Sequence, residues 1–341
     1  MDNYLRVILE LLKKNPNFNL IKILLKRIDK SKFLLYCNEF PLEQIIKNLE
    51  KIEYYSYSKI LKKNYLFNYI LRELRIKELL KINNLFKKNK IKYILIKGLD
   101  LYNKSFLRRT SDIDLLIEKK DIYKSEKIIK KIGYFYDSKI RSKESWLSTG
   151  HHLNFYRKSN KNLIVELHWQ LLQEGAPFRI NYSSIWKNSK EIILNKKRIR
   201  IPCLEHTIII LSIHSLYLST HTPYRDLYLI SKILKYNKID YKFLVKEAKA
   251  WKTENFVFIS LKTVKYCFDV NIDNYILNIL RGDRPQLILL KFLLLPKLNK
   301  ISFKKTNLYN LLFEILITNF KNKFKIIKRE LPVFIKKYVK L

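Results

Sequence analysis

The sequence predicts an α+β protein, in which a small mixed β-sheet is flanked by helices and lies between helical N- and C-terminal regions. Apolar residues recur at spacings of three and four over residues 1–90 and again from residue 203 to 341, which is typical of helices. Between residues 91 and 202 the period changes to that of strands. We therefore expect three regions, with boundaries 1–90, 91–202 and 203–341.

The composition favours a folded chain with long helices. Hydrophobic residues make up 48% of the 341 positions, which is enough to bury a core, and only 5 Gly and 8 Pro occur. A turn-rich β-sandwich or barrel would need more turn residues than that. The length allows two or three packed units, because a single core stops growing beyond roughly 250 to 300 residues.

The chain is strongly basic, with a formal net charge of +39. Its Lys and Arg residues are spread over the whole length and accompany many Ile, Asn, Tyr and Phe residues, a combination that an AT-rich genome produces by codon bias. We attribute most of the charge to that bias rather than to a nucleic-acid partner. What remains is the expectation that anionic ligands are attracted to the surface.

The sequence predicts a cytoplasmic protein without a transmembrane segment. The longest apolar run, 287–296, contains Lys291 and is shorter than the roughly 20 residues of a membrane span. The first 15 residues carry charges among the apolar ones, which predicts an amphipathic helix rather than a signal peptide. The basic segment 320–341 could lie on a membrane surface, although a solvated basic helix is the preferred interpretation. Three distant cysteines without a CxxC pair indicate a reducing compartment and no structural zinc: Cys37, Cys203 and Cys267.

Individual elements can be placed within the central region. We expect a helix over residues 121–132, because Gly133 occupies the position that commonly ends a helix. Alternating or β-branched runs predict six strands, at residues 93–97, 112–118, 152–157, 163–169, 191–195 and 198–202.

Asp112 and Asp114 stand at the beginning of the strand 112–118. Residues two apart on a strand point to the same face, so both carboxylates project together while Ile113 projects to the other side. At about 6 to 7 Å apart they would repel each other, and one pKa would rise unless a cation lay between them. A divalent metal with oxygen ligands, such as Mg²⁺, is the economical partner.

Two further features complete the candidate site. Glu166 supplies a third acid on the strand 163–169, and His168 lies on the same face of that strand. His168 could orient Glu166 or contact the nucleotide, or it could be a packed, hydrogen-bonded histidine. Lys97 and Gly98 follow the strand 93–97 and lead into a short helix, where backbone N–H groups can hold a phosphate.

The order of these features resembles a known family. The run ILIKGLDLYNKSFLRRTSDIDLLIEKKD, then a helix ending in IGY and later VELHW, looks like the uncharacterised branch of the nucleotidyltransferase superfamily related to DNA polymerase β. That superfamily combines a strand, a Gly-(Gly/Ser) turn, an hDhDh strand and a third acid. The resemblance covers about residues 91–202. It departs from the pattern at Leu99, which replaces the second small residue of the turn.

The resemblance implies a nucleotidyltransferase core and transfer of a nucleoside monophosphate, most often AMP, from a nucleoside triphosphate to a hydroxyl, with release of pyrophosphate. The acceptor is open: a small molecule, a sugar, a protein or RNA. Two Mg²⁺ ions would be held by the catalytic residues Asp112, Asp114 and Glu166. The nucleotide-binding candidates are Lys97, Gly98, Arg109 and His168.

Two other functions stay open at this stage. They are phosphotransfer onto a surface polysaccharide precursor, and a non-catalytic RNA-binding or interaction role on the same fold. A weaker resemblance continues over residues 206–218 and 224–230, where family members carry a histidine and an Arg-Asp or similar pair in a helical domain. An acceptor pocket could lie there, but His214 and the pair Arg225 and Asp226 are interpreted as an internal ion pair between helices. Trp146, Trp169 and Trp186 are interpreted as core residues. A zinc site at His151, His152 and His168 is rejected, because their spacing fits no zinc motif.

Overall fold

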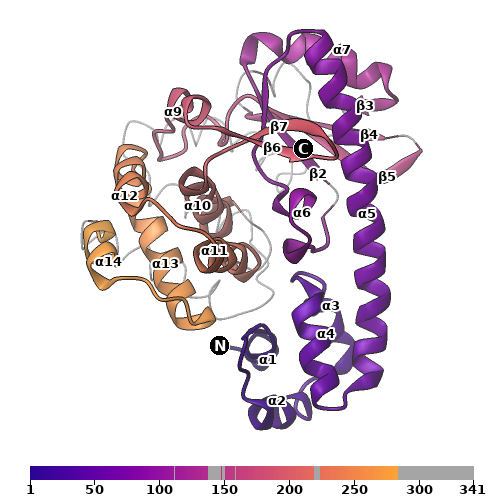
Figure 1. Cartoon of the computed structure of the whole chain (residues 1–341), viewed down its shortest axis with the longest axis vertical. Helices are drawn as coiled ribbons and strands as arrows, with labels where there is room; N and C mark the ends of the chain where they lie inside the picture. Colours follow the sequence, from indigo (N-terminus) through magenta and orange to yellow (C-terminus); the bar gives the residue numbers. More distant parts are fainter. Residues whose placement is uncertain (111, 137–146, 148–149, 158, 219–222, 283–341) are drawn as a thin grey trace, which may run out of the picture.

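The computed structural model describes residues 1–110, 112–136, 147, 150–157, 159–218 and 223–282 of the 341-residue chain (Figure 1). Three expectations lie outside these residues: the apolar run 287–296, the basic segment 320–341 and the placement of Trp146. Trp169 is buried, and Trp186 packs partly buried against the core, as predicted.

The N-terminal region is helical, as predicted. Asp2, Asn17 and Asp29 cap the first three helices by accepting hydrogen bonds from backbone N–H groups. The helix α5 has 34 residues and runs along one side of the molecule, from the N-terminal helices to the sheet (Figure 1). The five helices are α1 (Asn3–Leu11), α2 (Phe18–Leu25), α3 (Lys30–Cys37), α4 (Leu42–Lys51) and α5 (Tyr55–Lys88).

The central region forms a five-stranded sheet with the order β1-β2-β5-β4-β3. The pair β2 and β5 is parallel and the other pairs are antiparallel, so the sheet is mixed and the predicted α+β class is confirmed. The strands are β1 (Tyr93–Leu95), β2 (Asp112–Ile117), β3 (Tyr134–Tyr136), β4 (His152–Arg157) and β5 (Asn160–His168).

Short helices connect these strands. The predicted helix over 121–132 appears as α7 (Ile122–Lys131) after a 3₁₀ turn, η2 (Lys119–Asp121). Gly133 follows with φ +93°, a left-handed conformation that glycine adopts without a steric cost. The turn after β1 leads into α6 (Leu99–Tyr102) and η1 (Lys104–Phe106), as expected for the segment after Gly98.

The sheet has one apolar face and one face that carries both acidic and apolar residues. Ile113 and Leu115 of β2 and Val165 of β5 point to the first face, where they pack against apolar residues of α5 and α7. Leu116 points to the second face and belongs to a different apolar cluster, which includes residues of the C-terminal helices. The alternation along β2 therefore turns its acidic residues toward the C-terminal region.

A β-hairpin and the C-terminal helices complete the described chain. The hairpin turns at Asn195 and Lys196, which both have positive φ. The predicted turn lies one residue later, at residues 196–197. The difference arises because Asn tolerates the left-handed conformation and because Lys197 already pairs with Leu194 in the ladder. Its elements and those that follow are α9 (Tyr182–Lys187), β6 (Lys190–Leu194), β7 (Lys197–Ile201), α10 (Leu204–Ile213), the π-helical turn η3 (His214–Leu218), α11 (Tyr224–Tyr236), α12 (Tyr241–Ala250), α13 (Glu254–Phe268) and α14 (Asn274–Leu280).

One apolar cluster joins the two helical regions. It contains Leu5 and Leu42 from the N-terminal helices together with Leu227 and Val257 from the C-terminal helices. The predicted boundaries at residues 90 and 202 stay predictions, but the regions they separate share this core. Within the described part of the chain, no helix is both long and apolar enough to cross a membrane.

Candidate active site

The parallel pairing of β2 and β5 brings the three predicted acids to one face of the sheet. Asp114 lies directly opposite Glu166 in the register, and Asp112 lies opposite Ile164. Side chains at paired positions of neighbouring strands project to the same side. Asp114 is only 3% exposed, while Asp112 is partly exposed and accepts a short hydrogen bond from the Thr110 hydroxyl.

Two basic side chains contact these acids. The Nζ atom of Lys97 lies 2.6 Å from Oδ1 of Asp114. The Nε2 atom of His168 lies 3.1 Å from the same oxygen and 3.0 Å from Oε2 of Glu166. The structure therefore places Lys97 and His168, both predicted to bind the nucleotide, directly against the acids.

The charges in this cluster reinforce one another. Burial alone would lower the pKa of Lys97, but the charges of Asp114, Asp112 and Glu166 outweigh it and raise the pKa. Burial would also lower the pKa of His168, and its hydrogen bonds to Asp114 and Glu166 raise it instead. Conversely, the pKa of Glu166 falls despite burial, because His168 and Lys97 stabilise the carboxylate. The cluster thus holds ionised acids beside cations.

The turn at Gly98 positions Lys97. Gly98 has φ +87°, and a Cβ atom there would lie 3.0 Å from Cδ1 of Leu101, so the turn favours glycine and would be strained by any larger residue. The next residues are tied to α5, because Arg75 forms a buried ion pair with Asp100. Leu99 is buried in the apolar core, which explains why this position carries no small or hydroxyl residue.

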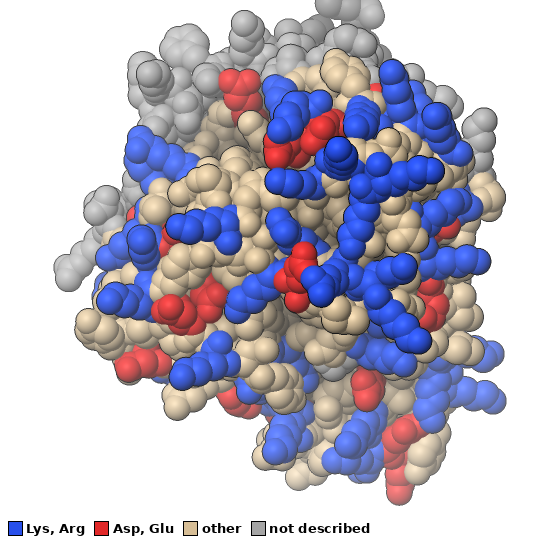
Figure 2. Space-filling model, turned by 45° about the horizontal axis from the view of Figure 1, so that its top comes forward, with Lys and Arg blue, Asp and Glu red and all other residues tan. Residues whose placement is uncertain are grey.

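Two cavities open beside the acids. The first measures about 480 Å³, and we call it the basic cavity after Lys97, Arg108, Arg109 and Arg225 in its lining. Four acids also line it: Glu39, Asp100, Asp112 and Asp114. Arg109, a predicted phosphate contact, is exposed along this wall. Figure 2 shows one face of the molecule on which Lys and Arg spread widely and outnumber Asp and Glu, as expected for a surface that attracts anions.

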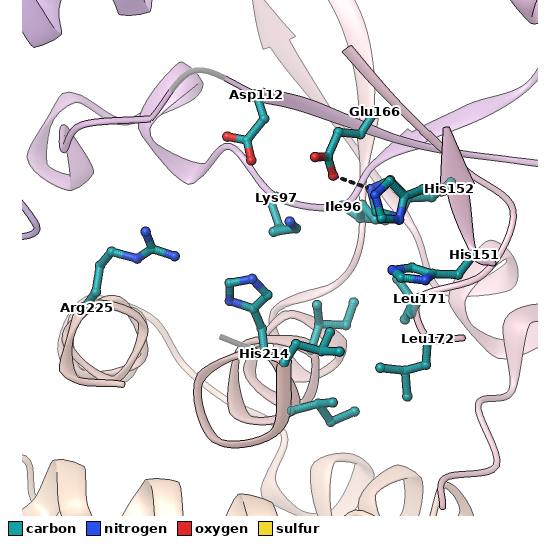
Figure 3. A pocket seen from close by; sticks show the side chains of 14 residues that line it. Ile96, Lys97, Asp112, His151, His152, Glu166, Leu171, Leu172, His214 and Arg225 are labelled. Carbon is teal, nitrogen blue, oxygen red and sulfur yellow. Dashed lines mark hydrogen bonds and ion pairs between the residues drawn. The ribbon is translucent and has the colours of Figure 1, made fainter. Parts of the chain in front are cut away.

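The second, the histidine cavity, measures about 380 Å³. It combines Asp112 and Glu166 with histidines and an apolar wall (Figure 3). The residues that give it this character are His151, His152, His168, Leu171, Leu172, Ile210 and Ile213. Lys97, Asp112, His214 and Arg225 line both cavities, so the two spaces meet at the acids.

The C-terminal helices contribute to the site, in the region where the sequence left an acceptor pocket as an alternative to an internal ion pair. The predicted ion pair exists: Nδ1 of His214 lies 2.6 Å from Oδ2 of Asp226, and Nε of Arg225 lies 3.6 Å from Oδ1. In addition, Nη2 of Arg108 lies 3.7 Å from Oδ1 of Asp226. Twelve residues separate His214 from Asp226 in the sequence, and nothing in that spacing shows that the pair faces the sheet.

The three histidines rejected as a zinc site lie together in the structure. Ring nitrogens of His151, His152 and His168 all lie within 4.8 Å of one another. The antiparallel register of β4 and β5 pairs His152 with His168, a contact that sequence spacing does not reveal. Burial lowers the pKa of His152 to about 4, so its ring is neutral near pH 7. Nε2 of His168 already contacts Asp114 and Glu166.

The acids have the chemistry of a metal site. Ligand atoms of Asp114, Glu166 and His168 lie within 4.8 Å of one another, and Asp112 presents its carboxylate to the adjoining cavities. Carboxylate oxygens are the donors that Mg²⁺ prefers. The residues present therefore fit a divalent cation.

A mixed sheet with a DxD strand, a third acid on the parallel neighbour and a basic cavity defines a class of α+β transferases for phosphorus-containing groups. Residues 45–269 match the family model described as uncharacterised nucleotidyltransferase. The match spans more than half of the chain, so the chain belongs to that family, and the resemblance noted in the sequence is confirmed. No curated protein and no solved structure shows a significant match.

Proposed function

We propose that the protein transfers a nucleoside monophosphate, with AMP as the first candidate, from a nucleoside triphosphate to a hydroxyl of an acceptor and releases pyrophosphate. The observation that carries this proposal is the parallel pairing of Asp114 with Glu166 on the face that also bears Asp112. The family supports nucleotidyl transfer in general. The choice of AMP, the use of Mg²⁺ and the cytoplasmic location stay predictions.

Asp112, Asp114 and Glu166 would hold two Mg²⁺ ions. These ions would neutralise the charge of the phosphates and lower the pKa of the acceptor hydroxyl. Lys97 is placed to serve as a point charge for the phosphates, since it lines the basic cavity beside Gly98. Arg109 offers a second cation on the same wall. His168 holds Asp114 and Glu166 in one orientation, because a single nitrogen contacts both carboxylates.

The test is an incubation of purified protein with Mg²⁺, each α-labelled nucleoside triphosphate and a cell extract. Wild type is expected to label a product and release pyrophosphate, and the variant carrying Asp112→Asn and Asp114→Asn is expected to do neither. Glu118→Gln is a matched control, because Glu118 follows the same strand but pairs with Lys120 and lines neither cavity.

The outcomes separate the alternatives. Equal labelling by wild type and the double Asp→Asn variant would refute the proposal. A product formed without pyrophosphate release would instead indicate transfer of another phosphorus-containing group, as on a surface polysaccharide precursor. Steeply salt-dependent RNA binding without any product would indicate the non-catalytic alternative.

A further inference from the structure

The pair His214 and Asp226 has the geometry of an oriented base. Asp226 is ionised and only accepts hydrogen bonds, so the Nδ1 atom at 2.6 Å must donate to it. The other ring nitrogen, Nε2, then carries a lone pair that can accept a proton. A histidine held in this tautomer by a buried carboxylate is the arrangement that activates hydroxyl groups in other enzymes.

The fold directs His214 toward the acids. It is the first residue of the π-helical turn η3, where α10 ends, and such turns frequently mark functional sites. Figure 3 shows His214 rising from the wall opposite Asp112 and Glu166, with Lys97 between them. Asp226 is fully buried, and the His214 side chain is 19% exposed within both cavities.

The acids and their partners are poor proton acceptors. Oε2 of Glu166 is already engaged by Nε2 of His168 at 3.0 Å. Nε2 of His168 lies between Asp114 and Glu166, and Nζ of Lys97 contacts Asp114, so both nitrogens are already occupied. His214 differs, because burial lowers its pKa; Lys97 and Arg225 add to that effect, and Asp226 opposes it only in part. His214 is therefore neutral near pH 7.

The histidine cavity supplies a place for the acceptor. Its apolar wall includes Leu171, Leu172, Ile210 and Ile213, which suits an apolar body rather than a sugar. Its volume of about 380 Å³ suits one small molecule rather than a protein surface or an RNA strand. The basic cavity, with Arg108 and Arg109, suits the triphosphate.

We propose that the acceptor is a small hydroxy compound with an apolar body, bound in the histidine cavity, and that His214 removes its hydroxyl proton while Asp226 positions the ring. The inference rests on the proposed function and names the base and acceptor class for it. The hydroxyl proton moves to Nε2 of His214, and the acceptor oxygen bonds to the α-phosphorus. The bond from that phosphorus to the bridging oxygen breaks, and its electron pair leaves with pyrophosphate.

The test uses the full chain, Mg²⁺, a mixture of the four α-labelled nucleoside triphosphates, and a protein-free, RNase-treated ultrafiltrate of cell extract as the acceptor source. His214→Asn keeps an amide donor for Asp226 but lacks the base, so we expect the transfer rate to fall by about 10²- to 10⁴-fold. Asp226→Asn is expected to reduce it by about 10²-fold or more, because the tautomer is no longer fixed. Added imidazole should restore part of the rate to His214→Ala.

His206→Asn is the matched control. His206 forms a similar buried pair, with Nε2 at 3.0 Å from Oε2 of Glu247, but it lines neither cavity. Its loss should lower the melting temperature while the rate per folded molecule stays at the wild-type value. Because the pKa of His214 is lowered from the usual 6.5, the rate of wild type should decline only at a pH below that value, and His214→Asn should lack this decline.

The two proposals fail in different ways. If the proposed function is wrong, wild type itself forms no labelled product, or the double Asp→Asn variant labels as well as wild type. If only the present inference is wrong, wild type labels and the double variant does not, yet His214→Asn keeps the wild-type rate and pH profile. Label that appears only with protein or RNA, and not with the ultrafiltrate, would overturn the acceptor class.

Discussion

Replacing Gly98 with alanine tests whether the turn beside Lys97 controls the site. Gly98 has φ +87°, and an added Cβ would lie 3.0 Å from Cδ1 of Leu101 and 3.6 Å from Cδ1 of Leu95. Gly133 has a similar φ of +93°, but nothing lies within 4 Å of its added Cβ. The two glycines therefore share a backbone cost, and only one of them adds a steric contact.

The expected free energies follow from this comparison. A left-handed conformation costs an alanine about 1 to 2 kcal/mol. That cost should lower the free energy of unfolding for both Gly98→Ala and Gly133→Ala. The contact with Leu101 adds a further cost of up to about 1 kcal/mol at Gly98, since a side-chain methyl group can yield in part. We expect Gly98→Ala to be the more destabilised of the two.

The activity should separate the two variants more clearly. Lys97 precedes Gly98, and its Nζ atom contacts Asp114 at 2.6 Å, so a shifted turn displaces a charge within the site. A displacement of about 1 Å can reduce a rate by about 10²-fold. Gly133 lies after α7 and lines neither cavity, so Gly133→Ala should keep the wild-type transfer rate.

Denaturant unfolding gives the stabilities, and the rate of pyrophosphate release gives the activities. The reasoning is refuted if Gly98→Ala matches wild type in both measurements. It is equally refuted if Gly133→Ala loses as much activity as Gly98→Ala, because the loss would then reflect stability alone.

Three other predictions concern single interactions. Asp100→Asn should lower the free energy of unfolding by about 3 to 5 kcal/mol in denaturant titrations, because it leaves the fully buried Arg75 without its ion-pair partner; a loss below 1 kcal/mol would contradict this. The pKa of Asp226 is lowered, because the effects of His214 and Arg225 on the carboxylate outweigh burial. The ionised Asp226 therefore stabilises the folded protein fully above the usual pKa of 3.8, and this contribution to the free energy of unfolding is lost as the pH falls below that value. Asp226→Asn should therefore show a smaller loss of melting temperature below about pH 4 than wild type. Removal of divalent metal with EDTA should abolish transfer, and added Mg²⁺ should restore it. The melting temperature should change little on metal removal, because Lys97 already compensates the buried carboxylate of Asp114. Full transfer in EDTA would exclude a metal requirement.

The sequence pattern was most informative where local periodicity decides the structure. The strand around Asp112 and Asp114 and the strand of Glu166 follow from alternation, and Gly133 ends its helix as expected. Their shared face could be predicted because a strand has a period of two. The strand Tyr134–Tyr136 was not predicted, since three residues after a glycine give too short a pattern, and its pairing with β4 decides its structure.

Contacts between distant segments could not be predicted in the same way. Arg75 and Asp100 lie 25 residues apart, and His214 lines the same cavities as Asp112 from the end of a helix that follows the whole sheet. Such contacts depend on how α5 and α10 pack, which one sequence does not specify. Leu99 departs from the family pattern in the phosphate turn, and the structure shows that its side chain is buried in the core.

The most direct test of the account is a double-mutant cycle on Asp114 and Glu166, measured as labelled product formed from α-labelled nucleoside triphosphate. If the two acids hold the same metal ions, Asp114→Asn and Glu166→Gln should each reduce the rate by about 10³-fold or more, and the combined variant should lose less than about tenfold further. Multiplicative losses, or a wild-type rate in either single variant, would contradict a shared site.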